Sequence, residues 1–356
     1  MFGEYSIVEV LLFASLVVGA LLLDLYAHKQ DKAISMRDAA LWSVFWIVLS
    51  LCFAVYVGYE HGRAQGMLFV TGYFLEKSLS VDNLFVFIAV FSSFAIRPEF
   101  QHRVLYFGIL GAIFMRLLFI ALGSSFIALF GKWALTIFGV FVLWTAWKMW
   151  QSSQQDGEEL EDYSNHWSVR LTRRILPVSP QMHGHNFFTR INGALCVTPL
   201  FLCLVTIEIA DVMFAFDSVP AIFSVFAGLE EPLPLGTQTF LVYTSNIFAI
   251  LGLRSLYFLL AAANRFLAHL EKAVIAILVF IGLKMLSGVL LEFHMPPEIS
   301  LIIVLGLLTG GVAASYAFPD KTAAQESNPA EGGVSADDAA RPDSSKHADG
   351  DGKRPE

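Results

Sequence analysis

Long apolar runs recur along this chain, separated by short polar stretches, and they constrain its fold more than any other feature. Hydrophobic residues make up 56% of the sequence. A helix needs about 20 mostly apolar residues to cross a bilayer, and each run approaches or exceeds that length. The sequence therefore predicts an all-α polytopic membrane protein with about nine transmembrane helices, at residues 7–27, 39–59, 67–95, 103–128, 132–150, 193–227, 239–261, 270–291 and 298–318.

The distribution of basic residues between the loops predicts how the chain is oriented. An odd number of spans places the two termini on opposite sides of the membrane. Alternate loops carry nearly all of the Lys and Arg: Lys29, Lys32, Arg37, Arg97, Arg103, Arg170, Arg173, Arg174, Arg190 and Arg265. Because basic loops stay in the cytoplasm, we expect the N-terminus outside and the C-terminus inside. No Lys or Arg precedes the first run, so we interpret it as a permanent span and not as a signal peptide.

Spans three to five and six to eight resemble each other. The landmarks occur in the same order in both units, and the aligned pairs are Glu76 with Asp211, Asp82 with Asp217, Arg116 with Arg254, and Lys148 with Lys284. Because each unit has three spans, the second copy enters the bilayer from the side opposite the first. This pattern predicts an inverted-topology repeat, a common plan of secondary transporters.

The repeat divides the chain into six parts. These are two N-terminal helices at 1–66, the first three-helix repeat at 67–150, a cytoplasmic loop at 151–192, the second repeat at 193–292, a last helix at 293–318 and a disordered cytoplasmic tail at 319–356. Much of the acid behind the net charge of −8 lies in the loop and the tail. The charge therefore indicates no acidic partner, and no nucleic acid is expected as one.

Acidic residues within the spans are the main indication of function. An acid at the centre of a spanning helix costs roughly 2.5 to 3.5 kcal/mol, so five of them oppose insertion by about 15 kcal/mol. The five are Glu76, Asp82, Glu208, Asp211 and Asp217. Acids retained at such a cost need a compensating partner, which can be a hard cation, protons or buried arginines.

Oxygen is the only ligand atom that these acids and their neighbours Asn83 and Ser218 offer, and oxygen suits Mg²⁺, Ca²⁺ or Mn²⁺. Glu76 and Asp82 are separated on an ideal helix by about 120° and about 9 Å, so one straight helix cannot direct both to one ion. We therefore expect a metal site between the two lead helices, with Asp82 and Asp217 central and the other acids in support. Inside the second lead helix, Pro220 frees the carbonyl of Phe216 as a further ligand.

Protons and a divalent ion would compete for these oxygens, which gives metal/proton exchange a physical basis. An alternative is that the acids only pair with Arg116 and Arg254, or that these arginines neutralise the site after the ion leaves. Lys148 and Lys284 are expected to reach an interface, and Asp24 to be an interfacial acid or part of a vestibule. His183 and His185 are expected to form a polar helix entry, with a metal-sensing patch as the alternative.

Other classes of function lack support in the sequence. Cys52, Cys196 and Cys203 form no Cys-x-x-Cys pair, so neither a disulfide framework nor a thiolate metal site is expected. There is no phosphate-binding loop for ATP-driven pumping and no protease signature. We therefore expect no enzyme activity and no cofactor, only a transported ion.

Three segments resemble the TerC family of integral membrane proteins, most closely its Alx branch. They are residues 72–83 (GYFLEKSLSVDN), 208–223 (EIADVMFAFDSVPAIF) and 244–254 (TSNIFAILGLR), and the likeness covers about residues 1–318. The resemblance implies manganese export across the bacterial inner membrane, with links to alkaline pH and tellurite resistance. We therefore expect a Mn²⁺ exporter that exchanges protons. A scaffold for a tellurite or envelope stress complex and an exporter of another divalent cation such as Ca²⁺ are the alternatives.

Overall fold

The structure, a computed structural model, describes residues 4–27, 35–153, 166–179, 181–191, 193–226, 229, 233–263, 270–293 and 295–317. Within these ranges, only the backbone is described at residues 25–27, 82, 152, 217, 262–263, 270–271 and 316. The described residues all belong to one compact unit, Met1–Pro319. The predicted tail at 319–356 lies outside the described residues.

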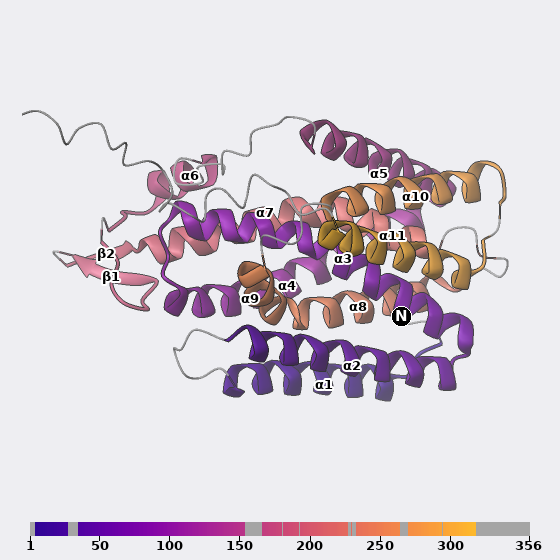
Figure 1. Ribbon diagram of the computed structural model, residues 1–356, viewed down its shortest axis with the longest axis horizontal. Helices are drawn as coiled ribbons and strands as arrows, with labels where there is room; N and C mark the ends of the chain where they lie inside the picture. The colour runs from indigo at the N-terminus through magenta and orange to yellow at the C-terminus, as the bar shows by residue number, and fades with distance from the viewer. Residues whose placement is uncertain are drawn as a thin grey trace, which may run out of the picture. The chain divides into compact units, whose positions relative to one another are not determined.

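Helices dominate the described chain, which confirms the all-α class (Figure 1). They are α1 (Ile7–Ala27), α2 (Met36–Glu60), α3 (Arg63–Ser93), α4 (Pro98–Phe130), α5 (Lys132–Ser153), α6 (Trp167–Ile175), α7 (Pro199–Phe223) with a 3-10 turn at Ser224–Phe226, α8 (Leu235–Leu251), α9 (Leu253–Ala263), α10 (Leu270–Leu290) and α11 (Pro297–Ala317). A hairpin of β1 (Phe188–Ile191) and β2 (Ala194–Val197) precedes α7.

Each predicted span coincides with a helix or with a helix pair. Seven described helices are long and apolar enough to cross a membrane, and α8 with α9, bent by 42°, adds an eighth. The one predicted span that is not among these eight is the third, α3, whose hydropathy is lowered by Glu76, Lys77 and Asp82 near its middle. That α3 crosses the membrane stays a prediction, supported by the burial of its neighbours in the bundle.

The helix in the sixth predicted span, α7, begins six residues after the predicted start at residue 193. Residues 194–197 of that run pair with 188–191 in the hairpin, and α7 starts at Pro199. Proline is favoured at the first turn of a helix because its missing N–H would have no partner there. Pro220 lies in the last turn of α7, where the α-helix gives way to the 3-10 turn. The helix break that Pro220 was expected to cause beside Asp217 therefore lies at the end of α7.

The two three-helix units pack against each other reciprocally. The lead helix of each unit contacts the second helix of the other, α3 with α8 and α7 with α4, while α5 contacts α10 and α3 contacts α7. Two copies related by a pseudo-two-fold axis would pack in this way. The reciprocity is what an inverted repeat predicts, and the inverted orientation itself stays a prediction.

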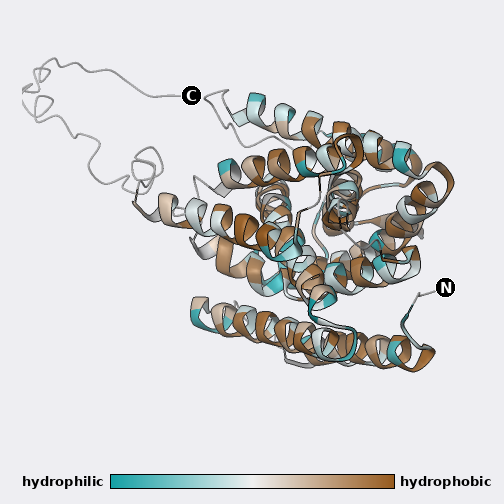
Figure 2. Ribbon diagram, turned by 90° about the vertical axis from the view of Figure 1, so that its right-hand side faces the viewer, coloured by the Kyte–Doolittle hydropathy of each residue, from teal (hydrophilic) through white to brown (hydrophobic). Residues whose placement is uncertain are grey.

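Hydrophobic residues occur along most of the helices, those at the outside of the bundle included (Figure 2). Large apolar side chains on the outer faces of α1, α2, α4 and α5 are exposed, including Ile7, Leu41, Phe114 and Trp133. In a bilayer such faces contact lipid tails, which are as apolar as the side chains, so they need not be buried against other helices. Polar and charged side chains are instead concentrated in the interior between α3, α4, α7 and α8.

Candidate functional site

A buried arginine on α4 joins the two lead helices. The side chain of Arg116 is 2% exposed and forms an ion pair with Glu76 of α3, whose side chain is 0% exposed. On its other side, its Nη2 lies 3.8 Å from Oδ1 of Asp211 on α7. Arg116 Nη1 also donates a hydrogen bond of 2.9 Å to the hydroxyl of Ser218. Three helices therefore meet in one charged cluster, which we call the Arg116 centre.

Two carboxylates share one guanidinium in the Arg116 centre, so its formal charge is negative. Glu76 Oε2, Asp211 Oδ2 and Arg116 Nε have no hydrogen-bond partner among the described residues. Leaving such atoms unpaired in a buried site costs roughly 1–3 kcal/mol each, and more when they are charged. The centre is therefore incompletely satisfied, and its free oxygens are the kind that a hard cation binds.

The two acids predicted as principal ligands lie on the same two helices. Asp82 is in α3, six residues after Glu76, and Asp217 is in α7, six residues after Asp211. Their side chains lie outside the described residues. Asn83, beside Asp82, is buried at 3% exposure. Because α3 runs without a break from Arg63 to Ser93, a shared site still requires ligands from both helices.

Glu208 lies one turn before Asp211 on α7 and packs against Gly111 of α4. A Cβ at Gly111 would overlap the Glu208 carboxylate, so this close approach depends on the glycine. Glu208 makes no hydrogen bond or ion pair with another described residue, and it does not join the Arg116 centre. Residues three apart share a helix face, so Glu208 lies beside Asp211 on one side of α7.

Arg254, which aligns with Arg116 in the repeat, pairs with an acid that lies outside both three-helix units. Its Nη2 lies 2.7 Å from Oδ1 of Asp24 in an ion pair, and it donates a hydrogen bond of 2.8 Å to the carbonyl of Asp24. Asp24 is 4% exposed and is therefore buried in the protein; its position at the membrane interface stays a prediction. A buried acid on α1 is stabilised there because the arginine neutralises it. Arg116 therefore serves the acids of the repeats, whereas Arg254 fastens α1 to α9.

The two aligned lysines also differ. Lys148 is exposed on α5, as expected for a side chain that reaches an interface. Lys284 is 5% exposed, and its Nζ donates to the carbonyl of Val225 at 3.2 Å, so it does not reach an interface. The 3-10 turn after α7 leaves carbonyls without helical partners, and the buried ammonium binds one of them.

The histidines of the loop before α7 are bound locally. His183 Nε2 lies 3.0 Å from Ser179 Oγ, and the ring of His185 packs 4.7 Å from that of Phe100. In the part of the chain that the structure describes, no three His, Cys, Asp or Glu side chains are grouped to hold a metal ion. The metal-sensing patch at His183 and His185 gains no support, and the lead-helix site depends on Asp82 and Asp217.

Two interior polar residues were missed by the sequence reasoning. Lys77 donates from Nζ to the carbonyl of Ala249 at 3.1 Å, and Asn246 is 0% exposed with no hydrogen-bond partner for either amide atom among the described residues. The sequence could have indicated both residues, because Lys77 lies in segment 72–83 and Asn246 in segment 244–254, two of the three segments that resemble the TerC family. Lys77 lies where α3 packs against α8, and Asn246 lies on α8 one turn before Ala249.

Comparison with known proteins gives a family. Residues 60–323 match the model of the integral membrane protein TerC family. The tellurium resistance protein TerC of Serratia marcescens is 45% identical over 343 residues, covering 89% of this chain and 96% of the relative. A relative from Escherichia coli (strain K12), named as a candidate membrane-bound redox modulator, Alx, is 42% identical over 306 residues, covering 83% of this chain and 90% of the relative.

The match to the family model covers most of the chain, and relatives of both names align along nearly all of their own length. No solved structure matches. The chain belongs to the TerC family of integral membrane proteins.

Proposed function

We propose that this protein is a secondary transporter that exports Mn²⁺ from the cytoplasm in exchange for protons. The observation that carries the proposal is the Arg116 centre, where Glu76 and Asp211 share one guanidinium and each keeps a carboxylate oxygen without a hydrogen-bond partner among the described residues. Ionisable residues inside a membrane commonly mark an ion pathway. Here they come from both three-helix units.

In this proposal Asp82 and Asp217 are the principal ligands, and Glu76, Asp211, Glu208, Asn83 and Ser218 support them. A divalent ion that approaches Glu76 and Asp211 takes over the charge compensation that Arg116 provides. When the ion leaves, the guanidinium or protons compensate the carboxylates again. Arg116 is thus a counter-charge that keeps the empty site stable without a bound ion.

The reciprocal packing of the two units supports a transport cycle. In inverted repeats, one unit rocks against the other around a site near the middle of the membrane. The contact between α3 and α7 lies between the two units and carries the acids. The choice of manganese and of export rests on the family resemblance, because such a repeat is symmetric and oxygen ligands also suit Ca²⁺.

Transport by purified protein tests the proposal. Proteoliposomes that enclose a Mn²⁺-sensitive dye, with an imposed pH gradient, should show Mn²⁺ flux coupled to the gradient. Asp82→Asn and Asp217→Asn should each abolish the flux, whereas Glu292→Gln, an exposed acid, should leave it unchanged. Full flux in both Asp variants would refute the ligand assignment. An excess of Ca²⁺ that blocks Mn²⁺ flux would indicate a broader divalent exporter.

The second candidate function is a membrane scaffold for a tellurite or envelope stress complex. The pairing of Arg116 with Glu76 and Asp211 favours it, because those acids then have a structural role. The TerC relatives are named as tellurium resistance proteins, which also favours this function. Under this function, acid-to-amide variants keep tellurite tolerance in cells, and deletion of residues 154–165 or 319–356 abolishes it. The transporter predicts the opposite result for Asp82 and Asp217.

A further inference from the structure

The short helix α6 has an apolar stripe that faces away from the protein. Ser168, Val169 and Thr172 on its inner face are buried. Trp167, Leu171 and Ile175 are 47%, 48% and 69% exposed. Residues spaced by four lie on one side of a helix, so these three large side chains form a continuous outward stripe. The stripe needs an apolar environment that the described protein does not supply.

The packing of α6 fixes its depth relative to a spanning helix. Ser168 Oγ lies 3.3 Å from Thr206 Oγ1 of α7, and Val169 packs with Val197 and Leu202. Thr206 follows the start of α7 by seven residues, which is about 10 Å along the helix axis. The span formed by α7 and its 3-10 turn is 28 residues, about 42 Å against a hydrocarbon core of about 30 Å. If the excess of about 12 Å is divided between the two ends of the span, Thr206 lies within about 5 Å of the boundary of the hydrocarbon core, so α6 packs beside that boundary.

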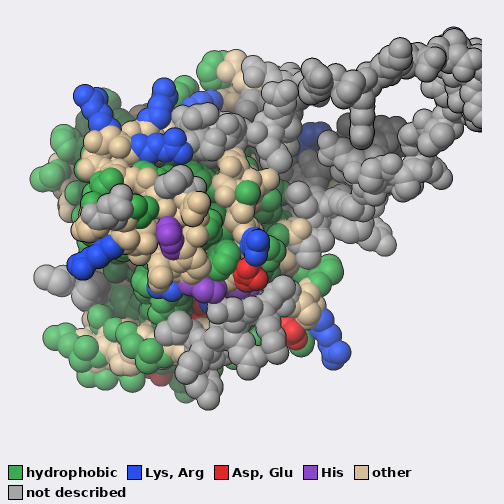
Figure 3. Space-filling model, turned by 90° about the vertical axis from the view of Figure 1, so that its left-hand side faces the viewer, with side chains coloured by type: hydrophobic (Ala, Val, Ile, Leu, Met, Phe, Trp, Pro, Cys, Tyr) green, Lys and Arg blue, Asp and Glu red, His purple; other side chains and the backbone are tan. Residues whose placement is uncertain are grey.

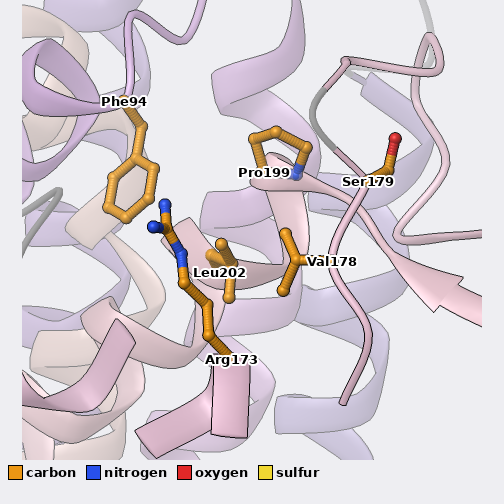
Figure 4. Close-up of a pocket in the computed structure, with 6 residues that line it drawn as sticks. All are labelled: Phe94, Arg173, Val178, Ser179, Pro199 and Leu202. Atoms are coloured by element: carbon orange, nitrogen blue, oxygen red, sulfur yellow. The ribbon is translucent and has the colours of Figure 1, made fainter. Parts of the chain in front are cut away.

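Arginines flank the apolar stripe of α6. Arg170, Arg173 and Arg174 occupy the helix, which contains no acid, and no ion pair joins them to a described acid. Arg173 extends into an open cavity of about 420 Å³, with its guanidinium beside the ring of Phe94 and with Pro199 and Leu202 also in the lining (Figure 4). Lys and Arg side chains gather near the top of this end of the molecule, the height at which Figure 1 draws α6 (Figure 3).

We propose that α6 is an interfacial helix that binds anionic phospholipids of the leaflet on its side, the cytoplasmic one in the predicted orientation. Trp167, Leu171 and Ile175 enter the boundary between headgroups and acyl chains, as amphipathic interfacial helices do. The three arginines bind lipid phosphates, and the cavity at Arg173 receives one headgroup. The position of α6 beside the end of a span and the positive charge of its arginines both favour lipid as the ligand, because basic residues next to a span attract an anionic leaflet.

A spin label at position 171 tests the depth. Leu171→Cys is made in a Cys52→Ser background, because Cys52 is exposed, whereas Cys196 and Cys203 are buried and should not react. In proteoliposomes, the label should be more accessible to oxygen than to a nickel chelate. Gln181→Cys, exposed in the following loop, is the aqueous reference. Equal accessibility profiles at 171 and 181 would overturn the proposal.

Lipid titration of the full-length protein in detergent tests the charge. Phosphatidylglycerol should raise the melting temperature at lower concentrations than phosphatidylcholine. Each arginine is expected to contribute about 5-fold in affinity, so R170Q/R173Q/R174Q should lose about 100-fold and the preference with it. Arg63→Gln, at the other end of the spans, is the matched control.

Three results would overturn the lipid assignment. One is an unchanged phosphatidylglycerol preference in the triple variant. Another is equal displacement of the lipid by inorganic phosphate at millimolar concentration, which would indicate a site for the free anion. The third is phosphatidylglycerol binding that occurs only after Asp156, Glu158, Glu159, Glu161 and Asp162 are changed to amides, which would make that acidic segment the occupant.

Discussion

Lys77 of α3 donates from Nζ to the carbonyl of Ala249 at 3.1 Å, in the last turn of α8. The span bends by 42° just beyond, and a Cβ at Gly252 would come within 2.9 Å of the same Nζ. Carbonyls in the last turn of a helix have no partner within it. An ammonium from the lead helix of one unit therefore stabilises the break in the second helix of the other.

Lys77→Met should destabilise the protein by about 1–3 kcal/mol, because it removes the donor and leaves the Ala249 carbonyl buried without a partner. The melting temperature of the purified protein in detergent measures the loss. Lys148→Met, which removes an exposed lysine from α5, should leave it unchanged. Equal melting temperatures for the wild type and the Lys77 variant would show that the bend does not depend on this hydrogen bond.

Gly111→Ala should displace the Glu208 carboxylate, because the added Cβ would overlap it. Overpacking of this kind costs about 1–3 kcal/mol. Gly108→Ala is the matched control on the same helix, since a Cβ there would meet Ile207 at an ordinary 3.6 Å. Melting temperature and Mn²⁺ flux should both fall for the variant at 111 and stay near wild type for the variant at 108.

A second substitution separates displacement of Glu208 from general crowding at Gly111. Glu208→Ala in the Gly111→Ala background removes the overlapping atoms, so the melting temperature should recover. Flux should stay low if Glu208 is part of the ion path. A double variant as unstable as Gly111→Ala alone would place the conflict elsewhere.

Much of the fold could be predicted because the bilayer imposes it. Apolar runs must cross as helices, and every predicted range contains one or a helix pair. The pairing of Arg116 could also be predicted, since a cation in the middle of the second span of the first repeat was an expected partner for the acids of the lead helices. The hairpin at 188–197 was missed because its second strand merges with the apolar run that continues into α7.

The partners of Arg254 and Lys284 could not be predicted from the repeat. Alignment gives corresponding positions in two units, but Asp24 belongs to α1, outside both of them. Val225 becomes an acceptor only because the helix loosens to a 3-10 turn there. Such contacts depend on how segments distant in sequence meet, and local pattern contains no such information.

Asp24 and Arg254 should be energetically coupled. Either Asp24→Asn or Arg254→Met leaves a buried charge without its partner, at a cost of about 3–5 kcal/mol. The double variant should be more stable than the sum of the single losses predicts, with a coupling of about 0.5–3 kcal/mol in melting experiments. Additive losses would mean that the 2.7 Å contact contributes nothing to stability.

The Arg116 centre allows stability to be separated from transport. Arg116→Met alone leaves Glu76 and Asp211 as buried charges and should destabilise the protein by about 3–5 kcal/mol. Changing all three, as Glu76→Gln, Arg116→Met and Asp211→Asn, removes every charge and should restore the melting temperature to within a few degrees of wild type. Mn²⁺ flux in proteoliposomes should stay absent in this triple variant, because the acids that attract the ion are gone. A stable triple variant that still transports would show that the Arg116 centre is purely structural, and the ion path would have to lie elsewhere.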